Sequence, residues 1–159
     1  MRSGYENRGK SYRLPNSRYS LAEALRRLRT TNTKNYSLNV IERVEKSFSP
    51  SAVADFIDKR IVFVALQDQT VVGTASLDGP VVRSVFVAPQ AHRQGIGSQL
   101  MSTVEQRAKA LGIMTLHVPS SVTAERFYLK LGYSAVRETY HGEERTIVME
   151  RRLIDPDSV

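Results

Sequence analysis

The segment of residues 81–112 constrains the fold more than any other part of the chain. It starts with β-branched and aromatic residues, Val81 to Val87, that are typical of a β-strand, and Pro89 ends this run. From Ile96 onward apolar residues recur at the spacing of an amphipathic helix, and Gly112 stands where a C-terminal cap belongs. The segment therefore predicts a strand, a short turn and a long helix in direct succession.

The turn between this strand and this helix is suited to binding an anion. A helix N-terminus leaves backbone N–H groups without partners and carries partial positive charge. Gly95 and Gly97 would let a phosphate approach these groups without meeting a Cβ atom, and His92 and Arg93 add side-chain donors. A lone G-x-G turn is equally compatible with a plain connector. The sequence completes neither the P-loop motif nor the dinucleotide-binding motif here.

The same segment resembles the acyl-CoA signature of the GNAT superfamily of N-acetyltransferases. In that family a strand ending in V-x-P leads into [QR]-x-x-G-x-[GA], whose backbone amides bind the pyrophosphate of CoA. Val87-Ala88-Pro89 fits the first part, and Gly95 and Gly97 fix the register of the second. His92 stands where the family usually has Gln or Arg, so one side-chain contact differs while the backbone contacts stay available.

A second segment, Ala124 to Tyr133, is similar to the A-x-x-F-Y-x-K-x-G-[FY] stretch that many GNAT enzymes carry after the glycine-rich turn. Taken alone, Phe127 and Tyr128 would more often be core aromatics. The resemblance implies that Tyr128 donates its proton to the departing CoA thiolate, and that Ser121 replaces a family asparagine beside the pantetheine arm. The CoA-binding residues that the resemblance implies are Val85, Phe86, Val87, His92, Arg93, Gln94, Gly95, Ile96, Gly97, Ser98, Ser121, Phe127 and Lys130.

Acetylation of an amine also needs a donor for the thioester carbonyl and a base for the amine. The resemblance implies that the backbone at 85–87 meets the first need, at a bulge where two strands splay apart. His117 lies on the strand expected to flank this splay, and imidazole is suited to proton transfer near neutral pH. A lone histidine in a strand is more often structural, and Asp78, Glu138 and His141 are weaker candidates. The sequence offers no metal-ligand spacing and no Asp/His/Ser arrangement.

The other elements follow from periodicity, capping residues and turn residues. Before the opening segment we expect a short strand at 11–15, helices at 20–29, at 38–46 and from Ser49-Pro50 (with Val53, Phe56 and Ile57 inward), and strands at 61–66 and 71–77. After it we expect a strand at 114–118, a break at 119–121, a short helix ended by Gly132, and an antiparallel pair at 133–138 and 145–151.

This order predicts an α+β (α/β) protein whose sheet has one parallel connection and is covered by helices, and it matches the layout of the GNAT fold. The resemblance implies a central, mostly antiparallel sheet of about six to seven strands, with one parallel splayed pair and helices on both faces. A single domain is expected over residues 12–153, with a flexible segment at 1–11 and a polar tail at 154–159.

Composition narrows the function classes. The 159 residues suit one domain, and no run is apolar and long enough to span a membrane, so a cytoplasmic protein is expected. The absence of cysteine excludes disulfides and a cysteine nucleophile. The net charge of +7 suits an anionic ligand such as CoA and leaves nucleic-acid binding open.

The leading hypothesis is an acetyl-CoA-dependent N-acetyltransferase in which a primary amine attacks the thioester directly, with acetyl-CoA as cosubstrate and no metal. A catalytically silent acyl-CoA sensor and a basic nucleic-acid-binding module on the same fold are the alternatives, and the intact Tyr128 favours the enzyme. The acceptor stays open among small amines, antibiotics, peptide N-termini, lysines and aminoacyl-tRNA. The sequence is also compatible with a homodimer.

Overall fold

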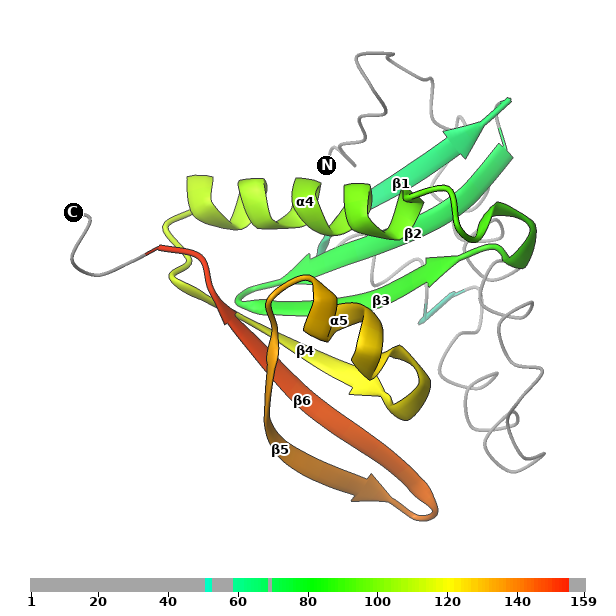
Figure 1. The fold of residues 1–159 in the computed structure, drawn as a ribbon. Coiled ribbons are helices and arrows are strands. Elements are labelled where there is room, and N and C mark those ends of the chain that lie inside the picture. Colours follow the sequence, from blue (N-terminus) through cyan, green and yellow to red (C-terminus); the bar gives the residue numbers. More distant parts are fainter. Residues whose placement is uncertain (1–50, 53–58, 69, 155–159) are drawn as a thin grey trace.

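The computed structural model describes residues 51–52, 59–68 and 70–154, which form a six-stranded sheet with two α-helices packed against it (Figure 1). The strands are β1 (Ile61–Gln67), β2 (Thr70–Asp78), β3 (Val81–Val87), β4 (Thr115–Ser121), β5 (Ser134–His141) and β6 (Glu144–Arg152). Their order across the sheet is β1-β2-β3-β4-β6-β5, and only the β3–β4 pair is parallel. This mixed sheet confirms the predicted α+β fold.

The parallel pair touches only where its strands begin. One ladder pair, Val81 with His117, joins β3 to β4, and the His117 N–H donates to the Pro80 carbonyl at 3.0 Å. Beyond this point the two strands diverge toward their C-terminal ends (Figure 1). On its other side β3 carries a bulge against β2, where Ser84 has a φ of 55°. The bulge bends β3 at the level where it leaves β4.

The predicted break at 119–121 is wrong, because β4 continues through Pro119 to Ser121. Pro119 pairs with Val148 of β6. The N–H of His117 points to β3, so the nitrogen of Pro119, two residues later, points to the same side. Since β3 has already diverged there, the N–H that proline lacks is not needed for a ladder, and the strand tolerates the residue.

Helix α4 (Ile96–Ala110) connects β3 to β4 and lies across β1, β2 and β3 (Figure 1). It approaches β2 closely at Gly73, where a Cβ atom would lie 3.0 Å from side-chain carbons of Ile96 and Leu100. The predicted C-terminal cap follows the helix at Gly112, which has a φ of 79° and donates to the Lys109 carbonyl. Its buried residues are Ile96, Leu100, Met101, Val104, Glu105 and Ala108.

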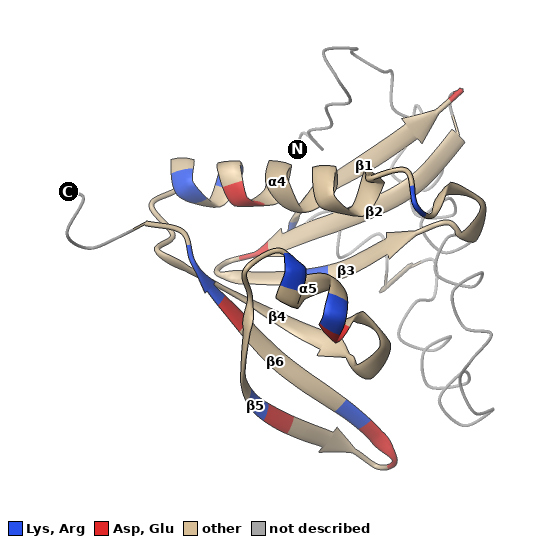
Figure 2. Ribbon diagram, viewed as in Figure 1, with Lys and Arg blue, Asp and Glu red and all other residues tan. Residues whose placement is uncertain are grey.

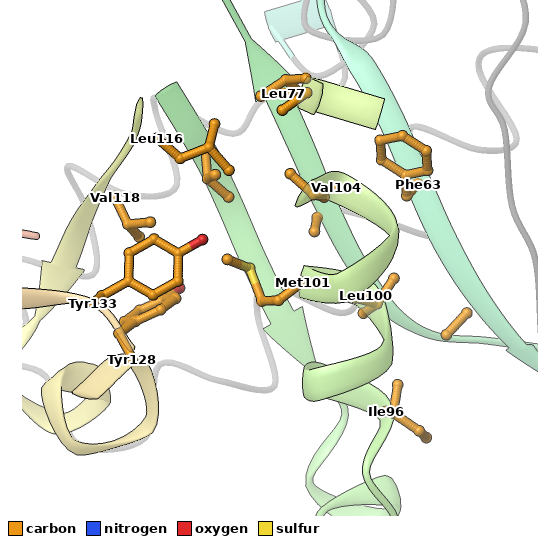
Figure 3. Packing of buried hydrophobic residues seen from close by; sticks show 14 of the residues in the cluster. Phe63, Leu77, Ile96, Leu100, Met101, Val104, Leu116, Val118, Tyr128 and Tyr133 are labelled. Carbon is orange, nitrogen blue, oxygen red and sulfur yellow. The ribbon is translucent and has the colours of Figure 1, made fainter. Parts of the chain in front are cut away.

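The core lies between α4 and the sheet and extends under the short helix α5 (Glu125–Lys130), which a 3-10 helix, η2 (Val122–Ala124), precedes. Figure 3 shows Tyr128 and Tyr133 in this core, on the side of Met101 nearer to Val118. Met101 is fully buried, so α4 and α5 share one apolar interior. This arrangement fixes the position of α5 relative to the start of α4.

Several predicted elements lie outside the described residues: the strand at 11–15, the helices at 20–29 and 38–46, and the segment 1–11. Of the helix expected from Ser49-Pro50, only Ser51, Ala52 and Lys59 are described, and all three are helical. Its inward-facing Val53, Phe56 and Ile57 lie outside as well. None of the helices in the described part of the chain is long and apolar enough to cross a membrane.

Candidate active site

A cavity of about 550 Å³ lies where β3 and β4 part. The end of β3, the turn into α4 and the segment from the end of β4 to α5 enclose it. Its lining residues are Val85, Phe86, Val87, Ala91, His92, Arg93, Gly95, Ile96, Gly97, Ser98, Ser121, Thr123, Ala124, Phe127 and Tyr128.

Most of the residues singled out in the sequence come together around this cavity. The exceptions are Gln94, Lys130 and His117, which do not line it. Ala91, Thr123 and Ala124 line the cavity without having been selected. Thr123 and Ala124 could have been found from the sequence, because they lie next to Ser121 and at the start of the second motif. Ala91 could not, because nothing in the sequence distinguishes it from any other buried alanine.

The turn before α4 presents backbone rather than side chain to the cavity. Gly95 is the N-cap residue with a φ of 75°, and no side chain caps this helix start. A Cβ atom on Gly95 would meet nothing within 4 Å, so space is open beside it. Arg93 also has a left-handed φ, of 64°. Left-handed residues in a turn direct successive N–H groups toward one side, which makes a concave surface for an anion.

Gly97 serves a different purpose from Gly95. A Cβ atom on Gly97 would lie 3.1 Å from the Phe127 ring and 3.7 Å from the side chain of Val87. The first turn of α4 therefore packs directly on α5 and on the end of β3. This contact brings the helix N-terminus and the tyrosine next to Phe127 to the same cavity.

The three polar residues of the turn have different surroundings. Nε2 of His92 lies 2.9 Å from the Val87 carbonyl oxygen, so the tautomer with its proton on Nε2 donates to the end of β3. Gln94 is turned toward β1, where its amide oxygen accepts from Gln67 at 2.6 Å. Arg93 is exposed and lines the cavity. Histidine thus ties the turn to β3, and arginine is left to face solvent or a ligand.

Ser121 ends β4 and starts the helical segment on the other side of the cavity. Its hydroxyl oxygen accepts from the Ala124 N–H at 3.3 Å and lies 3.2 Å from the Thr123 hydroxyl. Ser121 therefore caps η2, while no side chain caps α5 itself.

Tyr128 is 5% exposed and lines the cavity. Its ring makes edge-to-face contacts with Phe127 at 5.0 Å and Tyr133 at 5.8 Å between centroids. Burial raises the pKa of the Tyr128 phenol above its usual value, so the hydroxyl keeps its proton at neutral pH. No residue in the described part of the chain hydrogen-bonds to this hydroxyl.

His117 lies at the joined end of β3 and β4. Its Nε2 is 3.2 Å from the carboxylate of Glu150, directly opposite on β6, and the two side chains are 39% and 42% exposed. Of the weaker candidates for a base, Asp78 pairs with Arg83 at 3.2 Å. The hydrogen bond from Arg145 to Glu138 lowers the pKa of that carboxyl. His141 lies at the end of β5 beside the hairpin turn.

Within the described ranges, no three His, Cys, Asp or Glu side chains gather in a way that could hold a metal ion. The polar groups around the cavity are backbone amides, hydroxyls, imidazole and guanidinium. Such groups suit an anionic, hydrogen-bonding ligand.

Comparison with known proteins identifies relatives of this arrangement. The family model described as acetyltransferase (GNAT) domain matches residues 32–150. No curated protein sequence matches.

Solved structures share the fold at low sequence identity. A GCN5-related N-acetyltransferase from Rhodopseudomonas palustris superposes with a TM-score of 0.74 and 24% identity over 88% of this chain and 92% of that one. The PaiA N-acetyltransferase from Thermoplasma acidophilum, in complex with coenzyme A, gives 0.70 and 19% over 84% and 94%. An aminoglycoside 6'-N-acetyltransferase complexed with coenzyme A gives 0.61 and 20% over 86% and 92%.

Proposed function

The chain belongs to the GNAT family of acetyltransferases, and on this premise we propose that it transfers an acetyl group from acetyl-CoA to a primary amine. The observation that carries the proposal is the cavity between the parting ends of β3 and β4. Two features line this cavity. One is the N-terminus of α4, where Gly95 provides no side-chain cap, and the other is the buried Tyr128. Two of the structural relatives are complexes with coenzyme A, which supports the same ligand for this cavity.

The turn at 93–98 would hold the pyrophosphate. Its N–H groups lie at a helix N-terminus, where the helix dipole favours negative charge. The open space beside Gly95 is where a side chain at this position would obstruct a phosphate. Arg93, which is exposed and lines the cavity, adds a positively charged donor. Figure 2 shows basic residues on α5, and the exposed Lys130 is one of them.

The diverging edge of β3 would hold the pantetheine arm. Beyond Val81 this edge has no ladder to β4, so the backbone at 85–87 faces the cavity instead of a strand. Pantetheine carries amide groups that can bond to such an edge in the manner of a strand. The thioester carbonyl would then lie against backbone N–H groups, which stabilise the negative charge that develops on its oxygen.

The transfer itself needs two proton movements. The amine nitrogen attacks the thioester carbon, the carbon–sulfur bond breaks, and its electron pair goes to sulfur. Tyr128 either donates a hydrogen bond to that sulfur or transfers its hydroxyl proton to it. Its buried phenol keeps its proton at neutral pH and can therefore act as the donor. We assign to His117 the removal of the amine proton through water, with Glu150 holding its ring.

The test is a comparison of two tyrosine variants. Tyr128→Phe removes the hydroxyl and keeps the ring contacts, so we expect kcat to fall by roughly 10²-fold or more. The dissociation constant of CoA, measured by calorimetry, should stay unchanged. Tyr140→Phe is the matched control, because Tyr140 is 63% exposed on β5 and its hydroxyl bonds to Glu138. A Tyr128→Phe enzyme as fast as the parent, with chemistry rate-limiting, would remove Tyr128 from the reaction.

The acceptor is found by measuring free thiol release from acetyl-CoA over a panel of amines: a polyamine, an aminoglycoside, a peptide with a free N-terminus and a lysine, and an aminoacyl-tRNA. We expect turnover with at least one class. Tight acetyl-CoA binding without thiol release for any of them would contradict the enzyme. Binding of RNA that weakens steeply with salt, without CoA binding, would favour a nucleic-acid-binding module.

A further inference from the structure

The described core contains one buried carboxylate, and the reaction proposed above gives it no part. Glu105 of α4 is 8% exposed, among residues that are otherwise apolar or carry hydroxyl groups. Burying a carboxylate costs free energy unless it is paired, and an apolar side chain of similar size often serves stability as well. The carboxylate therefore calls for an explanation in terms of what it contacts.

Glu105 connects helix α4 to strand β6 and to Tyr133, which lies between α5 and β5. One of its oxygens lies 2.5 Å from Nη1 of Arg151 on β6. The other accepts a hydrogen bond from the hydroxyl of Tyr133, at 3.5 Å, which is long for such a bond. The ion pair thus fixes α4 to β6, and the weaker bond fixes the far end of the Tyr133 side chain.

Tyr133 in turn contacts the residue proposed to protonate the leaving sulfur. It is 2% exposed, and its ring packs edge-on against Tyr128 (Figure 3). Its N–H also donates to the Tyr128 carbonyl at 3.0 Å. The Tyr128 hydroxyl has no hydrogen-bond partner among the described residues, so packing of the ring against Phe127 and Tyr133 determines where the hydroxyl points.

We propose that Tyr133 is a positioning residue for Tyr128 in acetyl transfer, and that Glu105 and Arg151 act through Tyr133 by holding it between α4 and β6. The inference rests on the proposed role of Tyr128. A general acid must meet its partner within hydrogen-bond reach, and a misplacement of about 1 Å can cost on the order of 10²-fold in rate. Tyr133 prevents such a displacement by filling the space beside the Tyr128 ring.

The first experiment compares Tyr133→Leu with Tyr133→Phe, using acetyl-CoA and the best acceptor from the amine panel. Tyr133→Leu removes the ring, and we expect kcat to fall on the order of 10-fold to 10²-fold. KM for acetyl-CoA should change by less than about twofold, because Tyr133 does not line the cavity. Tyr133→Phe keeps the ring and should restore kcat to within about threefold of the parent, since only the long hydrogen bond is lost.

A matched control separates positioning from general loosening of the core. Leu77→Ala removes a side chain that is 2% exposed in β2, at the end of the core away from Tyr128 (Figure 3). It should lower Tm at least as much as Tyr133→Leu and leave kcat near that of the parent below Tm. Equal losses of kcat in Leu77→Ala and Tyr133→Leu would overturn the proposal.

The second experiment tests whether Glu105 acts through Tyr133. Glu105→Ala is made in the parent and in Tyr133→Leu, and kcat is measured for all four proteins. We expect Glu105→Ala to lower kcat in the parent by no more than about threefold, as Tyr133→Phe does, because both remove the same long hydrogen bond, and to have no further effect when residue 133 is Leu. The same fold-loss in both backgrounds would show that Glu105 acts independently of Tyr133, against the proposal.

Two outcomes distinguish this inference from the proposed function. If Tyr128→Phe is slow while Tyr133→Leu is as fast as the parent, Tyr133 does not position Tyr128, and Tyr128 keeps its proposed role as the general acid. If Tyr128→Phe is as fast as the parent, Tyr128 is not the general acid and the proposed mechanism is refuted. Crystal structures of the parent and of Tyr133→Leu in complex with CoA test the positioning role without an acceptor. We expect the Tyr128 hydroxyl to lie farther from the CoA sulfur in the variant than in the parent. The same distance in both structures would overturn the proposal.

Discussion

Arg151→Met should leave Glu105 buried without its cation and destabilise the fold in a pH-dependent way. The side chain of Glu105 is 11% exposed and that of Arg151 is 38% exposed. Breaking a fully buried pair costs about 3–5 kcal/mol, but water already screens an arginine that is more than one third exposed, so about 1–3 kcal/mol is expected here. For a chain of this length each kcal/mol lowers Tm by about 2–4 °C, so the middle of the range corresponds to about 4–8 °C.

The pH dependence follows from the direction of the Glu105 shift. Burial raises the pKa of Glu105 above its ordinary value, and the Arg151 guanidinium opposes the rise. Removing Arg151 therefore raises the folded-state pKa further above the unfolded one of about 4.3. A group with a raised folded-state pKa contributes stability below its unfolded pKa and loses that contribution as pH rises through its folded pKa. The Tm difference between parent and variant should thus be small near pH 4 and grow toward neutral pH.

Thermal unfolding followed by circular dichroism at several pH values measures this difference. In Arg151→Met/Glu105→Gln the side chain at 105 is neutral, so most of the lost Tm should return and the pH dependence should disappear. Arg152→Met, at the exposed next position, is the matched control and should stay within about 0.5 kcal/mol of the parent. A loss of Tm in Arg151→Met that is the same at pH 4 and pH 7.5, or that Glu105→Gln does not relieve, would refute the reasoning.

Two further predictions concern CoA binding and the proposed base. In Gly97→Val the added side chain meets the Phe127 ring, so we expect a loss of about 1–3 kcal/mol in stability and weaker CoA binding by calorimetry. Ser102→Val, at an exposed position of the same helix, should leave CoA binding unchanged, and unchanged binding in Gly97→Val would contradict the assigned close packing. His117→Gln should lower kcat without changing CoA binding, because the amide cannot take up the amine proton. A His117→Gln enzyme with the kcat of the parent would exclude His117 as the base.

The parts of the fold that local signals determine could be predicted from the sequence. β3 begins and ends where its β-branched run does, and the glycine predicted to cap α4 has the left-handed backbone that such a cap requires. Pro119 was misread because the rule against proline in strands is local, whereas its tolerance here depends on β3 having diverged. That divergence is a tertiary property with no counterpart in the periodicity of either strand.

The candidate site shows the same division. Two motifs led to the residues that line the cavity, because the turn and the aromatic pair each have recognisable neighbours in sequence. Glu105 could not be recognised from the sequence, because the other buried residues of its helix face are apolar. Its partner Arg151 is 46 residues away, so no local pattern connects the two. His117 was expected to flank the splay and lies where the splay begins, a distinction that depends on strand register.

The single ladder pair between β3 and β4 also has a mechanical consequence. Along this seam, force between β1-β2-β3 and β4-β6-β5 passes through the Val81–His117 pair and the bond to Pro80, whereas a full ladder would share it over many bonds. A molecule seated between the diverging strands would bridge the seam and carry part of that load. The ligand would then add a second connection across the seam and stabilise the sheet as well as react.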